Sequence, residues 1–319
     1  MAGLEARLFF EKSWEVAVSD LTSSKRELRL SYLVLVLPAV AIYFAVVAFP
    51  TVFSVILSLT NYNGGKIFGN PNVSFVGLKS YIRMFTDPTG YFYLALKNNM
   101  LIVAISVFGQ IPLGFVLAYI LSRKMVKGSG FFQTVIYLPN VISPVIIGIL
   151  FKAFYLNSNS VFMEIVRIFK PGAEFTMNNH PMLPVLVVML WMYTGMFMII
   201  FLANIQRIDT SIIEASKIDG ASEGQTLWYI ILPALSGVIV TSAILAIAGS
   251  LKSFDLLYVM TDGGPANMTS VLSLYMYKMA FRGAPNYPLA NAISTVMVII
   301  SFILIGITQT VEKRFGGKE

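Results

Sequence analysis

Three ionisable residues stand out because they lie near the ends of long apolar stretches. Lys152 lies in "FKAF", and Lys252 and Asp255 lie in "LKSFDLLYV". A charged group inside a membrane span is a candidate functional residue, because its burial in hydrocarbon is costly. The spacing of Lys252 and Asp255 puts both on one face of a helix, where they can pair. The preferred interpretation is a local ion pair near a water-filled cavity, and the alternative is direct contact with a ligand.

Other patterns that carry chemistry are missing from the sequence. Nothing matches the phosphate-binding pattern G-x-x-x-x-G-K-S/T, and there is no cysteine. The single histidine, His180, is expected to be solvated in a loop, because a metal site needs three or four ligands. No Ser/His/Asp set can be assembled within the apolar segments. We therefore expect this chain to be no enzyme and to hold no metal and no cofactor.

The stretch "SIIEASKIDGASEGQTLWYIILPALSG", residues 211–237, separates two apolar runs. Gly220 follows a run of good helix formers, as a glycine at a helix C-terminus does. Ser222 can cap a second helix, and Glu223 puts an acidic group in its first turn. Pro233 marks the entry to the next span. The pattern predicts a short helix, a turn and a second helix at the membrane surface.

The charge of this stretch indicates what it contacts. Glu214, Asp219 and Glu223 outnumber Lys217. Anionic inner leaflets attract basic helices rather than acidic ones. A protein partner therefore explains the segment better than an amphipathic loop that rests on lipid.

The composition is that of a polytopic membrane protein. The chain has 319 residues, of which 56% are hydrophobic and 12% charged, whereas soluble domains have about 25% charged residues. A helix needs about 20 apolar residues to cross the hydrocarbon core. The predicted fold class is an all-α membrane protein with six transmembrane helices. The six segments are 31–59, 99–122, 131–155, 182–204, 234–258 and 289–310.

The distribution of basic residues predicts the orientation of the chain. Lys and Arg are denser in the segments on the side of the two termini than in the longer loops on the other side. Cytoplasmic loops collect basic residues, which also explains the net charge of +7 without nucleic acid. Both termini are therefore expected in the cytoplasm. Residues 1–30 are then a cytoplasmic N-terminal segment and residues 311–319 a cytoplasmic tail.

The spacing within residues 214–233 resembles a signature of the permease subunits of bacterial ABC importers. That signature is E-A-A, three residues, G, nine residues and I-x-L-P. Every spacing is kept, and the one departure is Ser216 in place of alanine. The matching residues are Glu214, Ala215, Ser216, Gly220, Ile230, Leu232 and Pro233.

Further segments resemble the carbohydrate branch of this family. "YLPNVISPVIIGILFKAF" looks like its third span, although Asn140 is unusual there. The Thr-x-Gly-Gly-Pro element, residues 261–265, is similar to the permease subunit equivalent to the larger one of the maltose importer. The resemblance covers roughly residues 30–310 and leaves residues 1–30 outside.

The resemblance implies a type I importer fold, with a transmembrane core of five helices in residues 95–310. It also implies partners, namely a second homologous permease subunit, two ABC ATPase subunits that bind ATP and Mg, and an extracytoplasmic sugar-binding protein. Segment 211–233 would be the coupling helix, with Glu214 facing an ATPase and Gly220 making the turn. The other expected coupling residues are Ala215, Ser216, Asp219, Ile230, Leu232 and Pro233.

The function implied by the resemblance is import of a sugar or oligosaccharide across the inner membrane by alternating access. A sugar site near mid-membrane would use aromatic stacking and hydroxyl partners. Contact of Lys252 with the substrate would favour an acidic saccharide or a sugar phosphate. The candidate lining residues are Asn140, Tyr193, Thr194, Lys252, Phe254, Asp255 and Tyr258.

A transporter driven by an ion gradient is an alternative of another class. It would need coupling charges at mid-membrane. Lys252 and Asp255 are the only candidates for that role, and they lie near a span end. Such a transporter would also have no need of a spaced acidic helix pair in a cytoplasmic loop.

Overall fold

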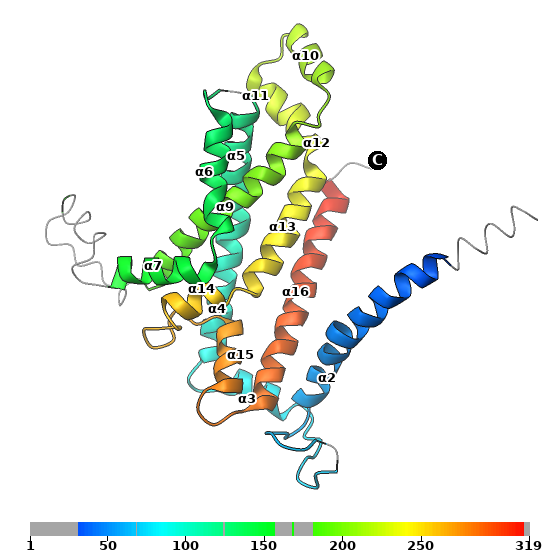
Figure 1. Cartoon of the computed structure of the whole chain (residues 1–319), viewed down its shortest axis with the longest axis vertical. Coiled ribbons are helices and arrows are strands. Elements are labelled where there is room, and N and C mark those ends of the chain that lie inside the picture. The colour runs from blue at the N-terminus through cyan, green and yellow to red at the C-terminus, as the bar shows by residue number, and fades with distance from the viewer. Residues whose placement is uncertain (1–30, 68, 124, 157–167, 169–180, 316–319) are drawn as a thin grey trace, which may run out of the picture. The chain divides into compact units, whose positions relative to one another are not determined.

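The computed structural model describes residues 31–67, 69–123, 125–156, 168 and 181–315 (Figure 1). Within these residues the secondary structure is helical, apart from one isolated bridge between Thr60 and Phe75. This confirms the predicted all-α fold class. The chain divides between Ile56 and Leu57 into two compact units.

One long apolar helix dominates the described part of the first unit. It runs from Ser31 to Ser58 and is long enough to cross a membrane. It contains a π-helical turn, η1 (Phe44–Ala48), and ends with α2 (Phe49–Ser58). The predicted span 31–59 agrees with this helix, whereas residues 1–30 lie outside the described residues.

Four more helical stretches of sufficient length and apolarity lie in the second unit. They are Tyr91–Ser122, Met182–Ile205, Ser236–Met260 and Tyr287–Val311. Three match the predicted spans to within a few residues, and Tyr91–Ser122 starts well before the predicted residue 99. The last helix continues beyond this span to Phe315, and the predicted cytoplasmic tail 311–319 stays a prediction.

The segment predicted as one span over residues 131–155 is bent. Helix α6 (Ser129–Val141) and helix α7 (Pro144–Leu156) meet at an angle of 91°. Ile142 between them has an extended backbone. Pro144 explains the break, because proline disfavours the helical conformation in the residue before it and cannot donate to the preceding turn. Residues 131–155 therefore form a broken span or a re-entrant pair of helices.

The other elements of the second unit complete the helical chain. They are α3 (Lys79–Thr86), α4 (Tyr91–Ile105), η2 (Ser106–Gln110), α5 (Ile111–Ser122), α9 (Met182–Ile205), α10 (Thr210–Ile218), α11 (Glu223–Thr226), η3 (Leu227–Ile231), α12 (Leu232–Ala234), α13 (Ser236–Leu251), α14 (Asp255–Met260), α15 (Leu272–Phe281) and α16 (Tyr287–Phe315). Figure 1 shows α10 and α11 at one end of this unit and α3 at the opposite end.

Three prolines follow π-helical turns at the same spacing. Pro50, Pro112 and Pro233 each stand two positions after the end of η1, η2 and η3. A proline removes one backbone donor, and its ring clashes with the carbonyl four residues earlier. A wider turn before the proline relieves this clash, so the helix continues with a local irregularity rather than a break.

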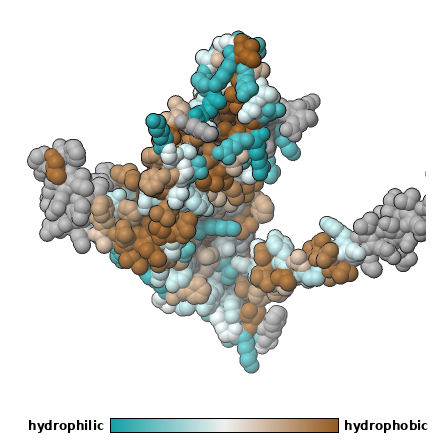
Figure 2. Space-filling model, turned by 45° about the horizontal axis from the view of Figure 1, so that its top comes forward, coloured by the Kyte–Doolittle hydropathy of each residue, from teal (hydrophilic) through white to brown (hydrophobic). Residues whose placement is uncertain are grey.

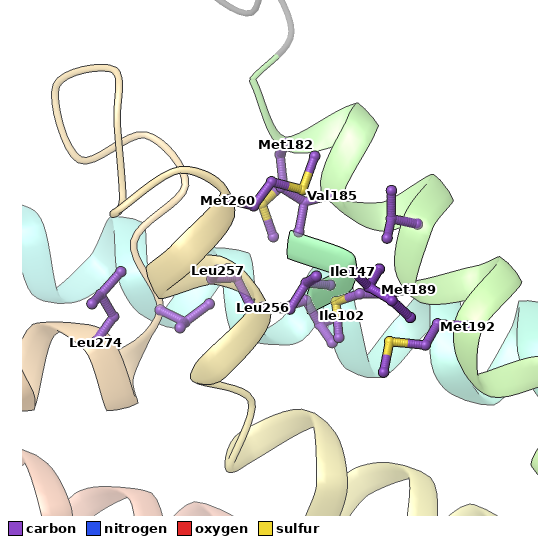
Figure 3. Packing of buried hydrophobic residues seen from close by; sticks show 12 residues of the cluster. Ile102, Ile147, Met182, Val185, Met189, Met192, Leu256, Leu257, Met260 and Leu274 are labelled. Carbon is purple, nitrogen blue, oxygen red and sulfur yellow. The ribbon is translucent and has the colours of Figure 1, made fainter. Parts of the chain in front are cut away.

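The core of the second unit consists of three clusters of buried apolar residues. Figure 3 shows the first, in which Ile102 of α4, Met189 of α9 and Leu257 of α14 lie together. A second cluster joins α5, α9, η3 and α13 around Phe201 and Ile231. The third packs α3 and α15 against the first turns of α4 and α16.

Two glycines allow α9 to approach its neighbours closely. A Cβ atom on Gly195 would lie 2.3 Å from the carbonyl oxygen of Ile136 in α6, and one on Gly114 of α5 would lie 2.8 Å from Cβ of Phe197. Real Cβ atoms do not approach that closely. Small residues at such crossings are typical of membrane helices, where packing rather than the hydrophobic effect holds helices together.

Buried amides and hydroxyls tie α4 to the C-terminal helices. Asn98 Nδ2 donates to the carbonyl oxygens of Met268 and Ser270, at 2.8 Å each. Asn99 donates to the carbonyl oxygen of Ser250 and accepts from the backbone N–H of Leu272. Bonds of this kind fix the register of helices in an apolar surrounding, where a polar group without a partner is costly.

Candidate functional site

The segment from Asp209 to Ala221 forms the predicted helix and turn. The Asp209 carboxylate caps α10 by accepting from the N–H of Ser211 at 2.9 Å, and this bond lowers the pKa of Asp209. Gly220 ends the helix with φ +82°, a conformation that glycine adopts without strain. The N–H of Ala221 then donates to the carbonyl oxygen of Ser216 at 2.9 Å, which closes the turn.

The second helix begins with a capping box. The N–H of Gln225 donates to Ser222 Oγ, and the N–H of Ser222 donates to Gln225 Oε1. These reciprocal bonds satisfy donors that the first helical turn leaves without a partner. They confirm the prediction that a helix starts here with Ser222 as its cap and Glu223 in its first turn.

Ser216 connects the two helices. Its side chain is buried, with Oγ donating to the carbonyl oxygen of Ile213 and lying 3.2 Å from the hydroxyl of Thr226 in α11. Alanine, the residue of the signature at this position, cannot make these bonds. The departure from E-A-A therefore adds a polar link across the turn.

Glu223 connects the segment to the transmembrane helices. Its carboxylate forms an ion pair with Arg123, directly after α5, and accepts from the hydroxyl of Tyr119 at 3.1 Å. Lys217 of α10 lies 3.5 Å from the same carboxylate. The hydrogen bond from Arg123 is the main cause of the lowered pKa of Glu223. The sequence pattern placed Glu223 in the first turn of a helix and in an acidic segment, but it did not predict the partner Arg123, which lies far from it in the chain.

The outward face of the segment combines charge with apolar side chains. Glu214 and Ala215 are exposed on α10, and Glu214 forms no ion pair with any described residue. Ile218 is 86% exposed and Tyr229 is 78% exposed. A neighbouring pocket of about 300 Å³ is lined by Asp219, Gly220, Ala221, Gln225, Tyr229 and Ile230. Figure 2 shows hydrophilic residues gathered at this end, with hydrophobic surface on the helices below.

The last two residues of the signature, Leu232 and Pro233, lie in the short helix α12. Leu232 begins α12, and Pro233 follows it directly. Leu232 is half-buried, and Pro233 is exposed. Pro233 follows η3 in α12. This part of the segment joins α13 through an irregular helical turn rather than through a long loop.

A cavity of about 270 Å³ lies within the second unit, between η2, α9 and the junction of α13 with α14. Four of the predicted substrate residues line it: Tyr193, Lys252, Phe254 and Asp255. The helix is interrupted between Lys252 and Asp255, because α13 ends at Leu251 and α14 begins at Asp255. No ion pair joins Lys252 to Asp255, so the predicted pairing on one helical face is wrong. Both charged groups instead belong to the cavity wall.

Three other predicted substrate residues do not line this cavity. Thr194 is buried, and its hydroxyl donates to the carbonyl oxygen of Leu190 at 2.5 Å. Tyr258 stacks on Phe254 with ring centroids 5.2 Å apart, and the guanidinium of Arg282 lies over its ring. Asn140 lies in α6, shortly before the bend.

Small polar residues of the cavity were missed. Ser106 and Gln110 come from η2, and Ser250 and Ser253 come from the end of α13 and the break that follows. Ser250 Oγ donates to Ser106 Oγ at 3.1 Å. Their signal in the sequence is weak, because single serines occur in many spans and nothing marked the break after Leu251.

The Thr-x-Gly-Gly-Pro element forms a firmly held loop. Lys278 Nζ donates to the carbonyl oxygen of Asp262 at 2.8 Å and to Asn267 Oδ1 at 3.0 Å. Arg282 pairs with the Asp262 carboxylate at 2.5 Å. Lys278 lies in the last turn of α15 and Arg282 directly follows the helix, so α15 and the loop are held together.

No cluster of three or more His, Asp or Glu side chains suited to a metal occurs among the described residues. His180 lies outside the described residues, so the expectation that it is solvated stays a prediction. The expected absence of metal and cofactor remains a prediction.

The fold and these two sites define a multi-span membrane protein with a polar helical segment at one end and a cavity among its helices. A family described as binding-protein-dependent transport system inner membrane component matches residues 110–317. The chain belongs to this family, and it is an inner-membrane component of such a transport system. The matched residues include the whole of segment 211–233.

Named relatives extend the similarity beyond the matched region. The lactose transport system permease protein LacF of Rhizobium radiobacter is 33% identical over 294 residues, which are 91% of this chain and 96% of that protein. The multiple sugar-binding transport system permease protein MsmF of Streptococcus mutans is 32% identical over 271 residues, 85% of this chain and 89% of that protein. Both begin to match well before residue 110, since the match covers most of this chain.

A solved structure shares the fold. It is a bacterial ABC transporter involved in the import of the acidic polysaccharide alginate. The TM-score is 0.75 at 20% sequence identity, and the match covers 92% of this chain and 99% of that one. The type I importer fold expected from the resemblance is therefore confirmed.

Proposed function

We propose that this chain is the permease subunit of an ATP-driven importer that passes a sugar or oligosaccharide across the inner membrane. The family supports binding-protein-dependent transport. The names of two relatives, one for lactose and one for multiple sugars, support a sugar as the substrate. An ion-coupled transporter loses support, because the family is defined by dependence on a binding protein.

The observation that carries this proposal is the rigid docking element between α9 and α13. Its turn is closed by Gly220, its two helices are linked by Ser216 and Thr226, and Glu223 ties it to the end of α5. A movement imposed on α10 is thereby transmitted to the transmembrane helices. In the proposed mechanism an ATPase subunit binds the exposed face with Glu214, and closure of the ATPase pair rocks the helices between inward-open and outward-open states.

The proposed assembly contains four kinds of component. This chain pairs with a second homologous permease subunit, and two ABC ATPase subunits bind ATP and Mg. An extracytoplasmic sugar-binding protein delivers the substrate to the cavity. The segment at 211–233 then lies in the cytoplasm, and both termini of the chain lie on the same side.

Substitutions at the turn and at its exposed acid test the docking role. Gly220→Pro cannot adopt φ +82°, because proline is held near −65°, and Glu214→Arg reverses the charge on the docking face. We expect both variants to reach the membrane but to lose uptake and ATPase stimulation by the binding protein. Gly224→Ala is the control, since a Cβ atom there meets no other atom within 4 Å. Unchanged uptake and unchanged ATPase stimulation in both test variants would exclude the docking role.

An acidic saccharide is a second candidate substrate, favoured by the position of Lys252. Its side chain belongs to the cavity wall and forms no ion pair with Asp255. A relative from Bacillus subtilis, 28% identical, is the polygalacturonan/rhamnogalacturonan transport system permease protein YteP. For an acidic substrate, Lys252→Met lowers uptake while assembly persists, and normal uptake by Lys252→Met would dismiss this candidate.

A further inference from the structure

A donor-rich pocket lies at the end of the second unit opposite the docking segment. Its volume is about 210 Å³, and it is lined by residues from the loop after α2, from α3 and from the start of α16. Helix α3 packs on the first turns of α4 and α16 through the third apolar cluster. Because α4 and α16 are membrane-spanning helices, α3 and the pocket lie at a membrane surface.

The free groups in this pocket are hydrogen-bond donors. Asn63 Oδ1 accepts from the backbone N–H of Tyr287 at 3.2 Å, and Asn286 Oδ1 accepts from that of Leu289 at 3.1 Å. Each of these oxygens already accepts one hydrogen bond, and the NH₂ group of each amide can donate to a ligand. This arrangement was not predicted, because the two asparagines are far apart in the chain.

Positive charge in the pocket is not balanced by a carboxylate. Lys79 and Arg83 lie one turn apart on α3 and line it, and neither forms an ion pair within the described residues. No Asp or Glu is among the lining residues. The N-terminus of α3 adds to this field, because no side chain caps it and helix N-termini attract anions. Together these groups are suited to a phosphate.

The other flank of α3 is apolar and exposed. Leu78 and Ile82 are each 61% exposed, and they line an open groove that also contains Lys79 and Arg83. The two cations thus stand between a polar pocket and an apolar row. This arrangement matches a phospholipid, whose charged head group is joined to acyl chains, better than it matches an acidic loop of a soluble protein.

We propose that the pocket binds the phosphate of an anionic phospholipid in the leaflet next to α3. Lys79, Arg83 and the amide groups of Asn63 and Asn286 hold the phosphate, and an acyl chain lies along Leu78 and Ile82. The bound lipid holds α3 at the membrane surface. This site is independent of the sugar specificity and of the docking segment.

The proposal is tested by native mass spectrometry of the assembled transporter in detergent, titrated with dioleoylphosphatidylglycerol or dioleoylphosphatidylcholine. We expect the wild type to retain phosphatidylglycerol preferentially. Lys79→Gln with Arg83→Gln weakens this binding by about tenfold or more, because each basic residue contributes to anionic lipid binding. The conservative pair Lys79→Arg with Arg83→Lys retains it. Lys66→Gln, an exposed lysine outside the pocket, is the matched control.

Two further measurements separate the possible sources of the anion and exclude misfolding. Thermal unfolding of the lipid-free variants should match that of the wild type. Inorganic phosphate at millimolar concentration should not displace the lipid. The proposal is overturned if the glutamine pair binds phosphatidylglycerol like the wild type, or if phosphate competes fully. It is also overturned if the pair loses stimulation by the binding protein while it retains the lipid, which would assign the pocket to an acidic protein.

Discussion

Ser216 and Glu223 are the residues that connect the proposed docking segment internally and to the transmembrane helices. Ser216 is buried against Thr226, across the turn that Gly220 closes. Glu223 faces Arg123 at the end of α5, and the two residues are a hundred positions apart in the chain. A motif in the sequence shows spacing within one segment, but it shows neither of these partners. The structure therefore adds to the signature the contacts through which, in the proposed mechanism, a movement of α10 is transmitted to the membrane helices.

Restoring the alanine of the signature tests the role of the Ser216 hydroxyl. Ser216→Ala leaves the buried hydroxyl of Thr226 without this partner, and a lost hydrogen bond of this kind costs roughly 0.5–1.5 kcal/mol. We expect faster hydrogen exchange in residues 210–226, measured by mass spectrometry. Ala215→Ser, at the exposed neighbouring position, should leave exchange unchanged. Equal exchange in Ser216→Ala and the wild type would contradict this role.

The ion pair of Glu223 predicts a dependence on pH. Because Arg123 lowers the pKa of Glu223 in the folded protein, the stabilisation is fully present above the ordinary pKa of a carboxyl group. It is lost as the pH falls through the lowered pKa. Thermal unfolding of the wild type and Glu223→Gln should therefore differ at neutral pH and converge in acid. The difference should be modest, since exposed pairs contribute roughly 0.2–1 kcal/mol.

A double-mutant cycle gives the control for this prediction. Arg123→Gln alone should lower the unfolding temperature, and Arg123→Gln combined with Glu223→Gln should cost less than the sum of the single changes. A difference between wild type and Glu223→Gln that persists unchanged at low pH would show that the ion pair is not its cause.

At the scale of the helices, the irregularities follow from prolines and glycines. Hydrophobic runs predicted five spans to within a few residues at most ends, because length and apolarity alone decide whether a helix can cross a membrane. The bend before Pro144 and the break after Leu251 were not predicted. Pro144 is itself a sequence signal for a break in a helix. Pro112 and Pro233, however, are accommodated within continuing helices, each after a π-helical turn. The sequence alone does not separate these two outcomes.

The same limit applies to the cavity. Aromatic and charged residues next to the break, such as Phe254 and Lys252, were recognised as candidates and do line it. Tyr258 is also aromatic, and Thr194 also carries a hydroxyl group, but neither lines the cavity. Which face of a helix meets a cavity depends on the packing of its neighbours, and a single sequence does not contain that information.

The close crossing of α9 with α6 gives a prediction about stability. Gly195→Ala places a methyl group where the carbonyl oxygen of Ile136 would lie 2.3 Å away. Overpacking of this kind costs about 1–3 kcal/mol, so a lower unfolding temperature and less protein in the membrane are expected. Gly306→Ala, on α16 with no atom within 4 Å of the new group, should be neutral. A wild-type unfolding temperature for Gly195→Ala would mean that the two helices do not cross this closely.

For the second unit as a whole, the proposed functional sites lie at its two ends and in the cavity among its helices. One end carries the docking segment, and the other carries the donor-rich pocket beside α3. The family of transport components and the sugar-transporting relatives support the proposal that this chain is a permease. In this proposal an ATPase subunit drives it from the end with the docking segment. The central claim is that the exposed face of α10 is the surface to which an ATPase subunit binds.

Site-directed cross-linking tests this claim most directly, since the chain contains no cysteine. Glu214→Cys on α10 and Lys66→Cys, in the loop between α2 and α3, provide single reactive positions in the assembled transporter. With a short bifunctional thiol-to-amine reagent, we predict a cross-link to the ATPase subunit from position 214 and none from position 66. Absence of the cross-link at position 214 in a fully assembled transporter, or its presence at position 66, would contradict the account.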